Sequence, residues 1–188
     1  MHVLGNVGLL GKIHAKSARY ITWLIDILAY DGRNMRNEIA QEIGRAHSNA
    51  SVIELGCGVG VLTKELAKHN LKADAVDSSP DMIDEARTLV ADAYFKCQNA
   101  VDVKGVEYDV AVSCMVFHEL PAVAHLEILR AVRECKGIWI IDIDPEYMPS
   151  EAMLAGEPYM LKYLNTFDET ADFFAAEAGM DLKRKSII

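Results

Sequence analysis

Three glycines alternate with other residues where an apolar run ends, at Gly56, Gly58 and Gly60. Glycine is needed where the backbone takes positive φ or touches a ligand, because a Cβ would clash there. A loop of this kind between a strand and a helix presents backbone N–H groups to a polar or anionic ligand. The alternative interpretation is a tight strand-to-helix turn that binds nothing.

The spacing of the glycines and the acid before them discriminate between ligands. A pyrophosphate-binding loop follows the pattern G-x-G-x-x-G, which would place its third glycine at residue 61, where this chain has Val61. Glu54 precedes the first glycine by two positions, and its charge would repel a pyrophosphate but attract an ammonium or sulfonium group. The pattern disfavours NAD and a nucleotide-dependent oxidoreductase, and favours a ligand that carries a cation.

A second acid follows the next apolar run. Asp77 lies 21 residues beyond Gly56, where the geometry of a parallel sheet places a carboxylate beside the first loop. A carboxylate at this point can hydrogen-bond both hydroxyls of a ribose. The alternative is that Asp77 caps the helix that starts at Pro80, although Ser78 or Ser79 could provide that cap.

Short apolar runs alternate with amphipathic segments after residue 48. This alternation predicts parallel strands connected by helices, which is an α/β fold with a doubly wound, mostly parallel sheet. The strands are expected at 51–55, 73–76, 93–96, 109–114 and 137–143, and the helices between them at 61–68, 80–91 and 120–134. Periodic apolar residues predict helices within 13–46, a late helix at 168–179 and a short final strand at 181–188.

The order E-x-G-x-G-x-G at 54–60, followed by D-x-S-x-x-M-I at 77–83, resembles the class I S-adenosylmethionine-dependent methyltransferases. The resemblance covers about residues 50–145 and continues more loosely through 173–179. It implies a Rossmann-like methyltransferase fold in which an N-terminal helical cap, residues 1–48, precedes a cofactor-binding domain, residues 49–188. Only nine residues follow Gly179, where the family has two strands, so we expect a shortened C-terminal edge. Either this sequence stops before the last strand, or that strand is lost, or a second copy covers the edge in a homodimer.

The resemblance also implies residues that hold S-adenosylmethionine. Four residues of the glycine loop match the family's contacts to the methionine part, and Tyr20 in the helical cap is a further candidate for that part. Asp77 matches the ribose carboxylate. The serine after the fourth strand offers its carbonyl to the amino group, and the remaining positions match the adenine site, with a plain turn as the alternative at 98–100. In chain order these candidates are Tyr20, Glu54, Gly56, Cys57, Gly58, Asp77, Ser78, Met82, Asn99, Ala100 and Ser113.

Two residues are candidates for chemistry on the methyl acceptor. His118 follows the fourth strand and could orient the acceptor or accept its proton, although a local helix-start role is an equal alternative. Asp144 follows the fifth strand and is expected beside the acceptor pocket, under a lid built from 146–167. Asp142 and Asp144 resemble an acid pair that holds a divalent ion in catechol-type relatives, but those relatives add a ligand where this chain has Ser113, so no metal is expected.

Composition limits the partners. The 188 residues carry a formal net charge of −9, which disfavours nucleic acid and anionic membranes, and no apolar run is long enough to span a bilayer. Four dispersed cysteines suggest reduced thiols in the cytoplasm. We therefore expect a small-molecule methyltransferase that releases S-adenosylhomocysteine. The alternative is a non-catalytic S-adenosylmethionine-binding protein that acts as a partner or regulator.

Overall fold

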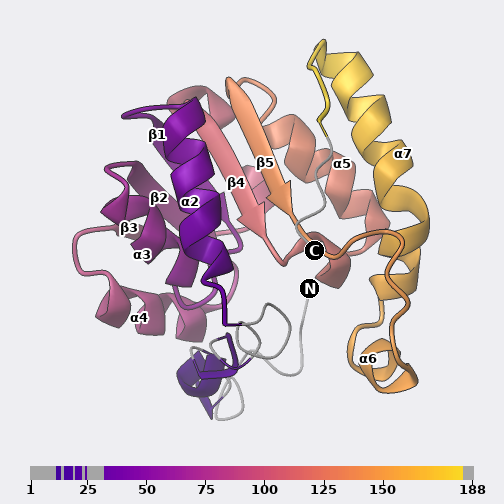
Figure 1. Cartoon of the computed structure of the whole chain (residues 1–188), viewed down its shortest axis with the longest axis horizontal. Helices are drawn as coiled ribbons and strands as arrows, with labels where there is room; N and C mark the ends of the chain where they lie inside the picture. Colours follow the sequence, from indigo (N-terminus) through magenta and orange to yellow (C-terminus); the bar gives the residue numbers. More distant parts are fainter. Residues whose placement is uncertain (1–11, 14, 19, 23, 25–31, 184–188) are drawn as a thin grey trace.

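Five parallel strands form the centre of the protein in the computed structural model (Figure 1). The structure describes residues 12–13, 15–18, 20–22, 24 and 32–183. The strands lie in the order β3-β2-β1-β4-β5, and each neighbouring pair is parallel. Their bounds are Ser51–Leu55 (β1), Lys72–Asp77 (β2), Tyr94–Cys97 (β3), Val110–Cys114 (β4) and Gly137–Ile141 (β5). The predicted parallel sheet of an α/β fold is confirmed.

Helices alternate with the strands and cover both faces of the sheet (Figure 1). They are Met35–Ala46 (α2), Val61–Lys68 (α3), Pro80–Leu89 (α4), Ala122–Ala131 (α5), Glu151–Gly156 (α6) and Met160–Ala178 (α7). Three short 3₁₀ turns lie at Ala100–Asp102 (η1), Gly105–Glu107 (η2) and Phe117–Glu119 (η3). The first three crossover helices thus lie at or within the segments expected from the sequence.

The central strand β1 is apolar on both faces because each face packs against helices. Successive strand residues point to opposite sides. Val52 belongs to a core with the buried residues of α2 and α3, whereas Ile53 belongs to a core with those of α5 and α7. Because all five strands are parallel, their carboxyl ends meet at one edge of the sheet, and the loops that follow them lie close together.

Helix α2 belongs to the layer that covers the sheet. It begins after Asn34, whose side-chain oxygen accepts a hydrogen bond from the backbone N–H of Asn37 at 3.0 Å. Its residues Ile39, Ala40 and Ile43 are buried in the core with Val52. The division of the chain at residue 48 stays a prediction. Most of the proposed cap that precedes α2 lies outside the described residues.

The segment after β5 is more helical than the sequence suggested. Residues 146–167 were expected to form a lid, but they include α6 and the first turns of α7, which starts at Met160 rather than at residue 168. Met160, Tyr163 and Phe167 are buried at three- and four-residue spacing. That apolar stripe is the signal that could have placed the start of α7.

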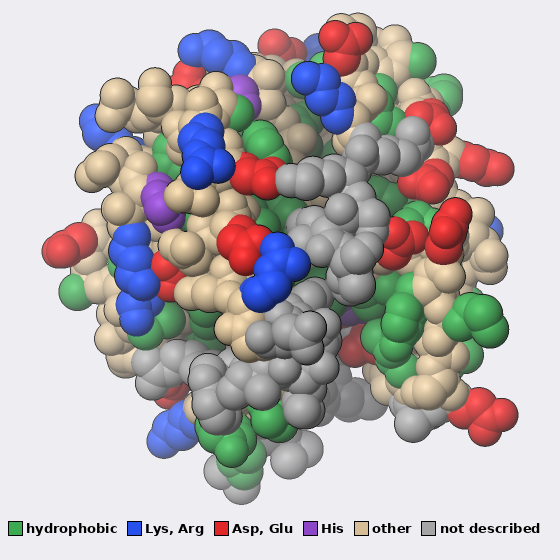
Figure 2. Space-filling view, viewed as in Figure 1, with side chains coloured by type: hydrophobic (Ala, Val, Ile, Leu, Met, Phe, Trp, Pro, Cys, Tyr) green, Lys and Arg blue, Asp and Glu red, His purple; other side chains and the backbone are tan. Residues whose placement is uncertain are grey.

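The edge beyond β5 carries no further strand in the described part of the chain. Residues 181–183 have no strand conformation, and the rest of the strand predicted at 181–188 lies outside the described residues. The homodimer through this edge stays a prediction. On the face shown in Figure 2, most basic side chains lie on the left and upper part, some of them beside acidic ones, whereas acidic side chains predominate on the right. Within the described residues, each helix is too short or too polar for a membrane span.

Candidate active site

The glycine loop joins β1 to α3 and lies against the end of β2. The φ angles of Gly56, Gly58 and Gly60 are +72°, +51° and +78°, which is the region that favours glycine. The N–H groups of Gly56 and Cys57 both donate to the carbonyl of Val76, at 2.9 and 3.0 Å. The loop is therefore fixed to the neighbouring strand, and its backbone conformation depends on glycine at three positions.

The three glycines differ in what surrounds them. A Cβ at Gly56 would lie 2.6 Å from Cγ2 of Val116, and one at Gly60 would lie 3.1 Å from the ring of Phe95. Among the described residues, a Cβ at Gly58 would meet no atom within 4 Å. A Cβ is thus excluded by Val116 at Gly56 and would be crowded at Gly60, whereas Gly58 leaves its backbone open on the side where a ligand could approach.

Asp77 binds the glycine loop directly. Its Oδ2 accepts a hydrogen bond from the N–H of Gly58 at 2.9 Å, and its Oδ1 accepts one from the N–H of Ser79 at 2.8 Å. Ser79 caps α4 by accepting a hydrogen bond from the N–H of Met82. The helix cap, which was the alternative role considered for Asp77, is therefore provided by Ser79. Burial raises the pKa of Asp77, while the two N–H donors lower it. Each carboxylate oxygen keeps a further lone pair for a ligand hydroxyl.

Glu54 lies buried beneath the loop. Only 3% of the residue is exposed, and its Oε2 accepts a hydrogen bond of 2.5 Å from the hydroxyl of Thr63 in α3. Burial raises the pKa of Glu54 to about 8, against the opposing effects of the Thr63 hydrogen bond and of the charge on Arg36. This carboxyl group is therefore largely neutral at pH 7, and a nearby cation would favour its ionised form.

A second cluster of polar groups lies at the ends of β4 and β5. Oδ2 of Asp142 accepts hydrogen bonds from the N–H groups of Val116, Phe117 and His118, at 3.1, 2.7 and 3.3 Å. Its Oδ1 accepts from the N–H of Ile143 at 2.8 Å and lies 2.5 Å from Nδ1 of His118. One carboxylate thus holds both the backbone of the turn and the imidazole ring.

His118 is a buried imidazole with a fixed orientation. Only 5% of the residue is exposed. Burial lowers its pKa, but the hydrogen bond and charge of Asp142, together with the charges of Glu119 and Glu157, raise it, and the net shift is upward. The ring lies 6.3 Å from that of Tyr163 in α7, whose hydroxyl donates to the carbonyl of Ile143 at 2.9 Å. Helix α7 therefore packs against the turn that carries His118.

A family model described as a methyltransferase domain matches residues 53–148, just over half of the chain. The chain belongs to the class I S-adenosylmethionine-dependent methyltransferases. The matched range contains the glycine loop, Asp77 and Asp142, so the family assignment and the geometry above concern the same part of the protein. S-adenosylmethionine is the cofactor of this family, as predicted from the sequence.

Two curated relatives and one solved structure illustrate the similarity. An uncharacterized methyltransferase of Schizosaccharomyces pombe is 34% identical over 88 residues, which are 45% of this chain and 34% of that protein. A trans-aconitate 2-methyltransferase of Mycobacterium marinum is 33% identical over 116 residues, 57% of this chain and 44% of that protein. The chain thus spans less than half the length of either relative.

The solved structure is magnesium protoporphyrin IX methyltransferase from Synechocystis PCC 6803 with bound S-adenosylmethionine. Its TM-score is 0.59 at 17% identity, and the alignment covers 81% of this chain and 70% of that one. The likeness concerns the fold, and it extends beyond the matched domain into most of the chain.

The glycine loop fits the cofactor of the family. The space beside Gly58, the carboxylate of Asp77 on its N–H and the buried acid Glu54 lie along the carboxyl ends of β1 and β2. Burial raises the pKa of the Cys57 thiol, with the charges of Glu54 and Asp77 adding to that effect, so Cys57 is no nucleophile at neutral pH.

The other predicted cofactor residues lie in varied surroundings. Ser78 is exposed, and Met82 is buried with Ala15 and Val59. The side chain of Asn99 caps η1 by accepting from the N–H of Val101 at 3.3 Å, so in this structure it makes the turn that was the alternative to adenine contact. Ala100 is half-buried, Ser113 is buried with its hydroxyl on the carbonyl of Leu55, and Tyr20 is 64% exposed.

The sequence reasoning did not find the partner of His118. Asp144, the predicted acid, is exposed and accepts a hydrogen bond from the N–H of Glu146 within its own turn. The acid that contacts His118 is Asp142, which the sequence suggested only as half of a metal-binding pair. Thr63 was also missed, although its position one turn inside α3 faces the strand that carries Glu54.

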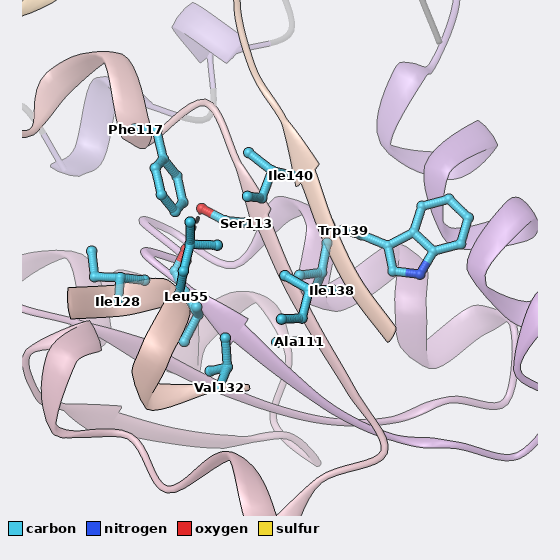
Figure 3. Close-up of a pocket in the computed structure, with 11 residues that line it drawn as sticks. Leu55, Ala111, Ser113, Phe117, Ile128, Val132, Ile138, Trp139 and Ile140 are labelled. Carbon is cyan, nitrogen blue, oxygen red and sulfur yellow. Dashed lines mark hydrogen bonds between the residues drawn. The ribbon is translucent and has the colours of Figure 1, made fainter. Parts of the chain in front are cut away.

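An apolar pocket lies deeper in the protein, between the sheet and α5 (Figure 3). Leu55, Ser113 and Phe117 lie around it, and Ser113 is linked to Leu55 by the hydrogen bond drawn there. The pocket has no room for a water molecule. It is a packed interface beneath the glycine loop and does not receive a ligand.

Proposed function

We propose that the protein transfers the methyl group of S-adenosylmethionine to a small molecule and releases S-adenosylhomocysteine. The observation that carries the proposal is the contact between Asp77 and the N–H of Gly58, at 2.9 Å. It places a carboxylate suited to a ribose against the one glycine of the loop that faces open space. An empty strand-to-helix turn needs neither feature.

Residues of this chain would hold the cofactor at both ends. Asp77 would accept hydrogen bonds from the ribose hydroxyls, and Glu54, once ionised, would attract the ammonium group through the loop of Gly56 to Gly58. Ser78, Met82, Asn99 and Ala100 would line the adenine side, and Ser113 and Tyr20 the methionine side. The bound cofactor would supply an electrophilic methyl group on its sulfonium, and the neutral thioether of S-adenosylhomocysteine would be the leaving group.

The protein's own contribution to the reaction is alignment and exclusion of water. In-line transfer needs the acceptor atom, the methyl carbon and the sulfur in a row, in a site from which water is removed. His118 would orient the acceptor or take its proton, with Asp142 holding the ring. Asp144 is proposed to contact the acceptor from the turn after β5.

A small acceptor is supported by two observations. The net charge is −9, which does not suit binding to a phosphate backbone. One curated relative is named for action on trans-aconitate, a small acid. We propose no named acceptor for this chain.

Calorimetry tests the cofactor. The protein should bind S-adenosylmethionine and S-adenosylhomocysteine but not NAD, and Asp77→Ala should weaken binding by about 1–3 kcal/mol through lost charge-assisted hydrogen bonds. Asp84→Ala, an exposed acid on α4, is the matched control and should bind normally. Equal affinity of Asp77→Ala and the unchanged protein would contradict the ribose assignment.

A product screen tests the reaction. The protein is incubated with S-adenosylmethionine and a metabolite extract, and new methylated compounds are sought by mass spectrometry. Formation of S-adenosylhomocysteine in step with one product supports the methyltransferase. Cofactor binding with no turnover on any fraction would instead favour the non-catalytic partner or regulator.

A further inference from the structure

Three side chains that can bind metals converge beside the turn after β4. One ligand atom from each of His118, Glu119 and Glu157 lies within 4.8 Å of the other two. His118 and Glu119 belong to η3, whereas Glu157 ends α6, 38 residues further along the chain. The cluster therefore exists only because the segment after β5 folds back over the end of β4.

The imidazole of His118 is oriented as metal-binding histidines usually are. Asp142 lies 2.5 Å from Nδ1 and is a hydrogen-bond acceptor, so Nδ1 carries the proton and Nε2 is the nitrogen with a free lone pair. A carboxylate behind the ring fixes the tautomer and raises the basicity of the other nitrogen. Both carboxylate oxygens of Asp142 are engaged in hydrogen bonds to the backbone and to His118, so Asp142 is not a ligand.

Several acidic groups act on the His118 ring. Three carboxylates, those of Asp142, Glu119 and Glu157, act on one imidazole. Oε2 of Glu157 is buried and accepts no hydrogen bond from any described residue. A buried carboxylate oxygen without a donor is costly, and a cation in front of it would remove that cost.

We propose that His118, Glu119 and Glu157 bind one divalent first-row transition-metal ion, of the series from Mn²⁺ to Zn²⁺. One imidazole and two carboxylates form a mixed donor set that suits these ions better than Mg²⁺ or Ca²⁺, which prefer oxygen alone. Metal–ligand bonds of about 2.1 Å bring neighbouring ligand atoms to roughly 3–3.5 Å, so atoms that now lie up to 4.8 Å apart must approach one another by up to about 1.5 Å.

The site differs from the acid pair that the sequence had suggested and rejected for a metal. It uses neither Asp142 nor Asp144 as a ligand. Three protein ligands leave at least one coordination position open, as in catalytic rather than structural sites. One consequence rests on the proposed function: an acceptor oxygen bound at the open position would be held in a defined orientation toward the methyl group. His118 would then orient the acceptor through the ion and would not take its proton.

The test measures metal binding without cofactor, so that its outcome does not depend on methyl transfer. Metal-free protein is titrated with Mn²⁺ at pH 7.5, and free Mn²⁺ is followed by electron paramagnetic resonance, with Zn²⁺ as competitor. We expect saturable binding of one Mn²⁺ per chain that Zn²⁺ displaces. Glu157→Gln and, separately, Glu119→Gln should weaken it by at least about 10-fold.

Glu151→Gln is the matched control, because Glu151 is an exposed acid on the same segment, in the first turn of α6. It should bind Mn²⁺ as the unchanged protein does, and circular dichroism checks that all variants are folded. Absence of saturable binding at millimolar Mn²⁺ would overturn the proposal. So would binding that both glutamine variants retain at full strength, since the ion would then sit on other surface acids.

Discussion

The two halves of the proposed active site, a cofactor side and an acceptor side, are built in different ways. On the cofactor side, Gly56, Gly58 and Asp77 act mainly through the backbone, and they lie on consecutive strands of the sheet. On the acceptor side, side chains 24 residues or more apart meet, as Asp142 and His118 do. The first half depends on local conformation, and the second on the tertiary fold.

The largest effect is expected on the acceptor side, from Asp142→Asn. Asparagine has nearly the same size, but one of its two terminal groups is an NH₂, which donates hydrogen bonds and cannot accept them. Backbone N–H groups or Nδ1 of His118, which meet an acceptor in the unchanged protein, would therefore face a second donor. Because the side chain is almost fully buried, the free energy of unfolding should fall by about 3–5 kcal/mol.

Urea denaturation of Asp142→Asn checks this loss, with Asp144→Asn as the matched control. Asp144 is exposed and its carboxylate accepts one backbone hydrogen bond, so its stability should change by less than about 1 kcal/mol. Similar losses in the two variants would show that Asp142 does not organise the turn.

Gly56 joins the two halves, because its Cα faces Val116. Gly56→Ala places a Cβ 2.6 Å from Cγ2 of Val116 at a φ of +72°, so overpacking and backbone strain act together. The free energy of unfolding should fall by about 2–4 kcal/mol. Adding Val116→Ala should recover the part due to overpacking. No recovery in the double variant would leave strain as the whole effect.

Gly58 allows the cofactor side to be tested alone. Gly58→Ala introduces a Cβ into open space at a φ of +51°, so it should fold with a stability loss near that of Gly179→Ala, another glycine with positive φ and free space. Only Gly58→Ala should weaken S-adenosylmethionine binding, by about 1–3 kcal/mol, as calorimetry would measure. Equal cofactor affinity in both variants would mean that the ligand does not approach Gly58.

The smallest effect is a pH dependence from Glu54. Its pKa is about 8 in the folded protein, so at pH 7 the group is mostly protonated. An ammonium beside it favours ionisation, so binding at pH 7 should release about one proton, and affinity should rise up to about tenfold per pH unit below pH 8.

Calorimetry in buffers of different ionisation enthalpy counts the released proton. Glu54→Gln has no titrating group at this position and should abolish both the release and the pH dependence. Proton release that persists in Glu54→Gln would assign it to another residue.

The sequence predicted the cofactor half more fully than the acceptor half. β1 and α3 have the predicted bounds, and Asp77, at the end of β2, lies against the glycine loop as expected. These features follow from residues that are close in sequence or on adjacent strands. The pairing of His118 with Asp142 depends on the register between β4 and β5. The position of Glu157 depends on the packing of α7. No local pattern encodes such distances.

One hydrogen bond, from the Tyr163 hydroxyl to the carbonyl of Ile143, gives the connection between β5 and α7 a particular property. It holds the two ends of residues 144–162 together, so this stretch is an inserted segment whose ends are fixed next to each other. Insertions or exchanges within a segment whose ends are fixed in this way cost little loop-closure entropy and leave the sheet unchanged. Under the proposed function, replacing this stretch would change the surroundings of the acceptor without changing the sheet.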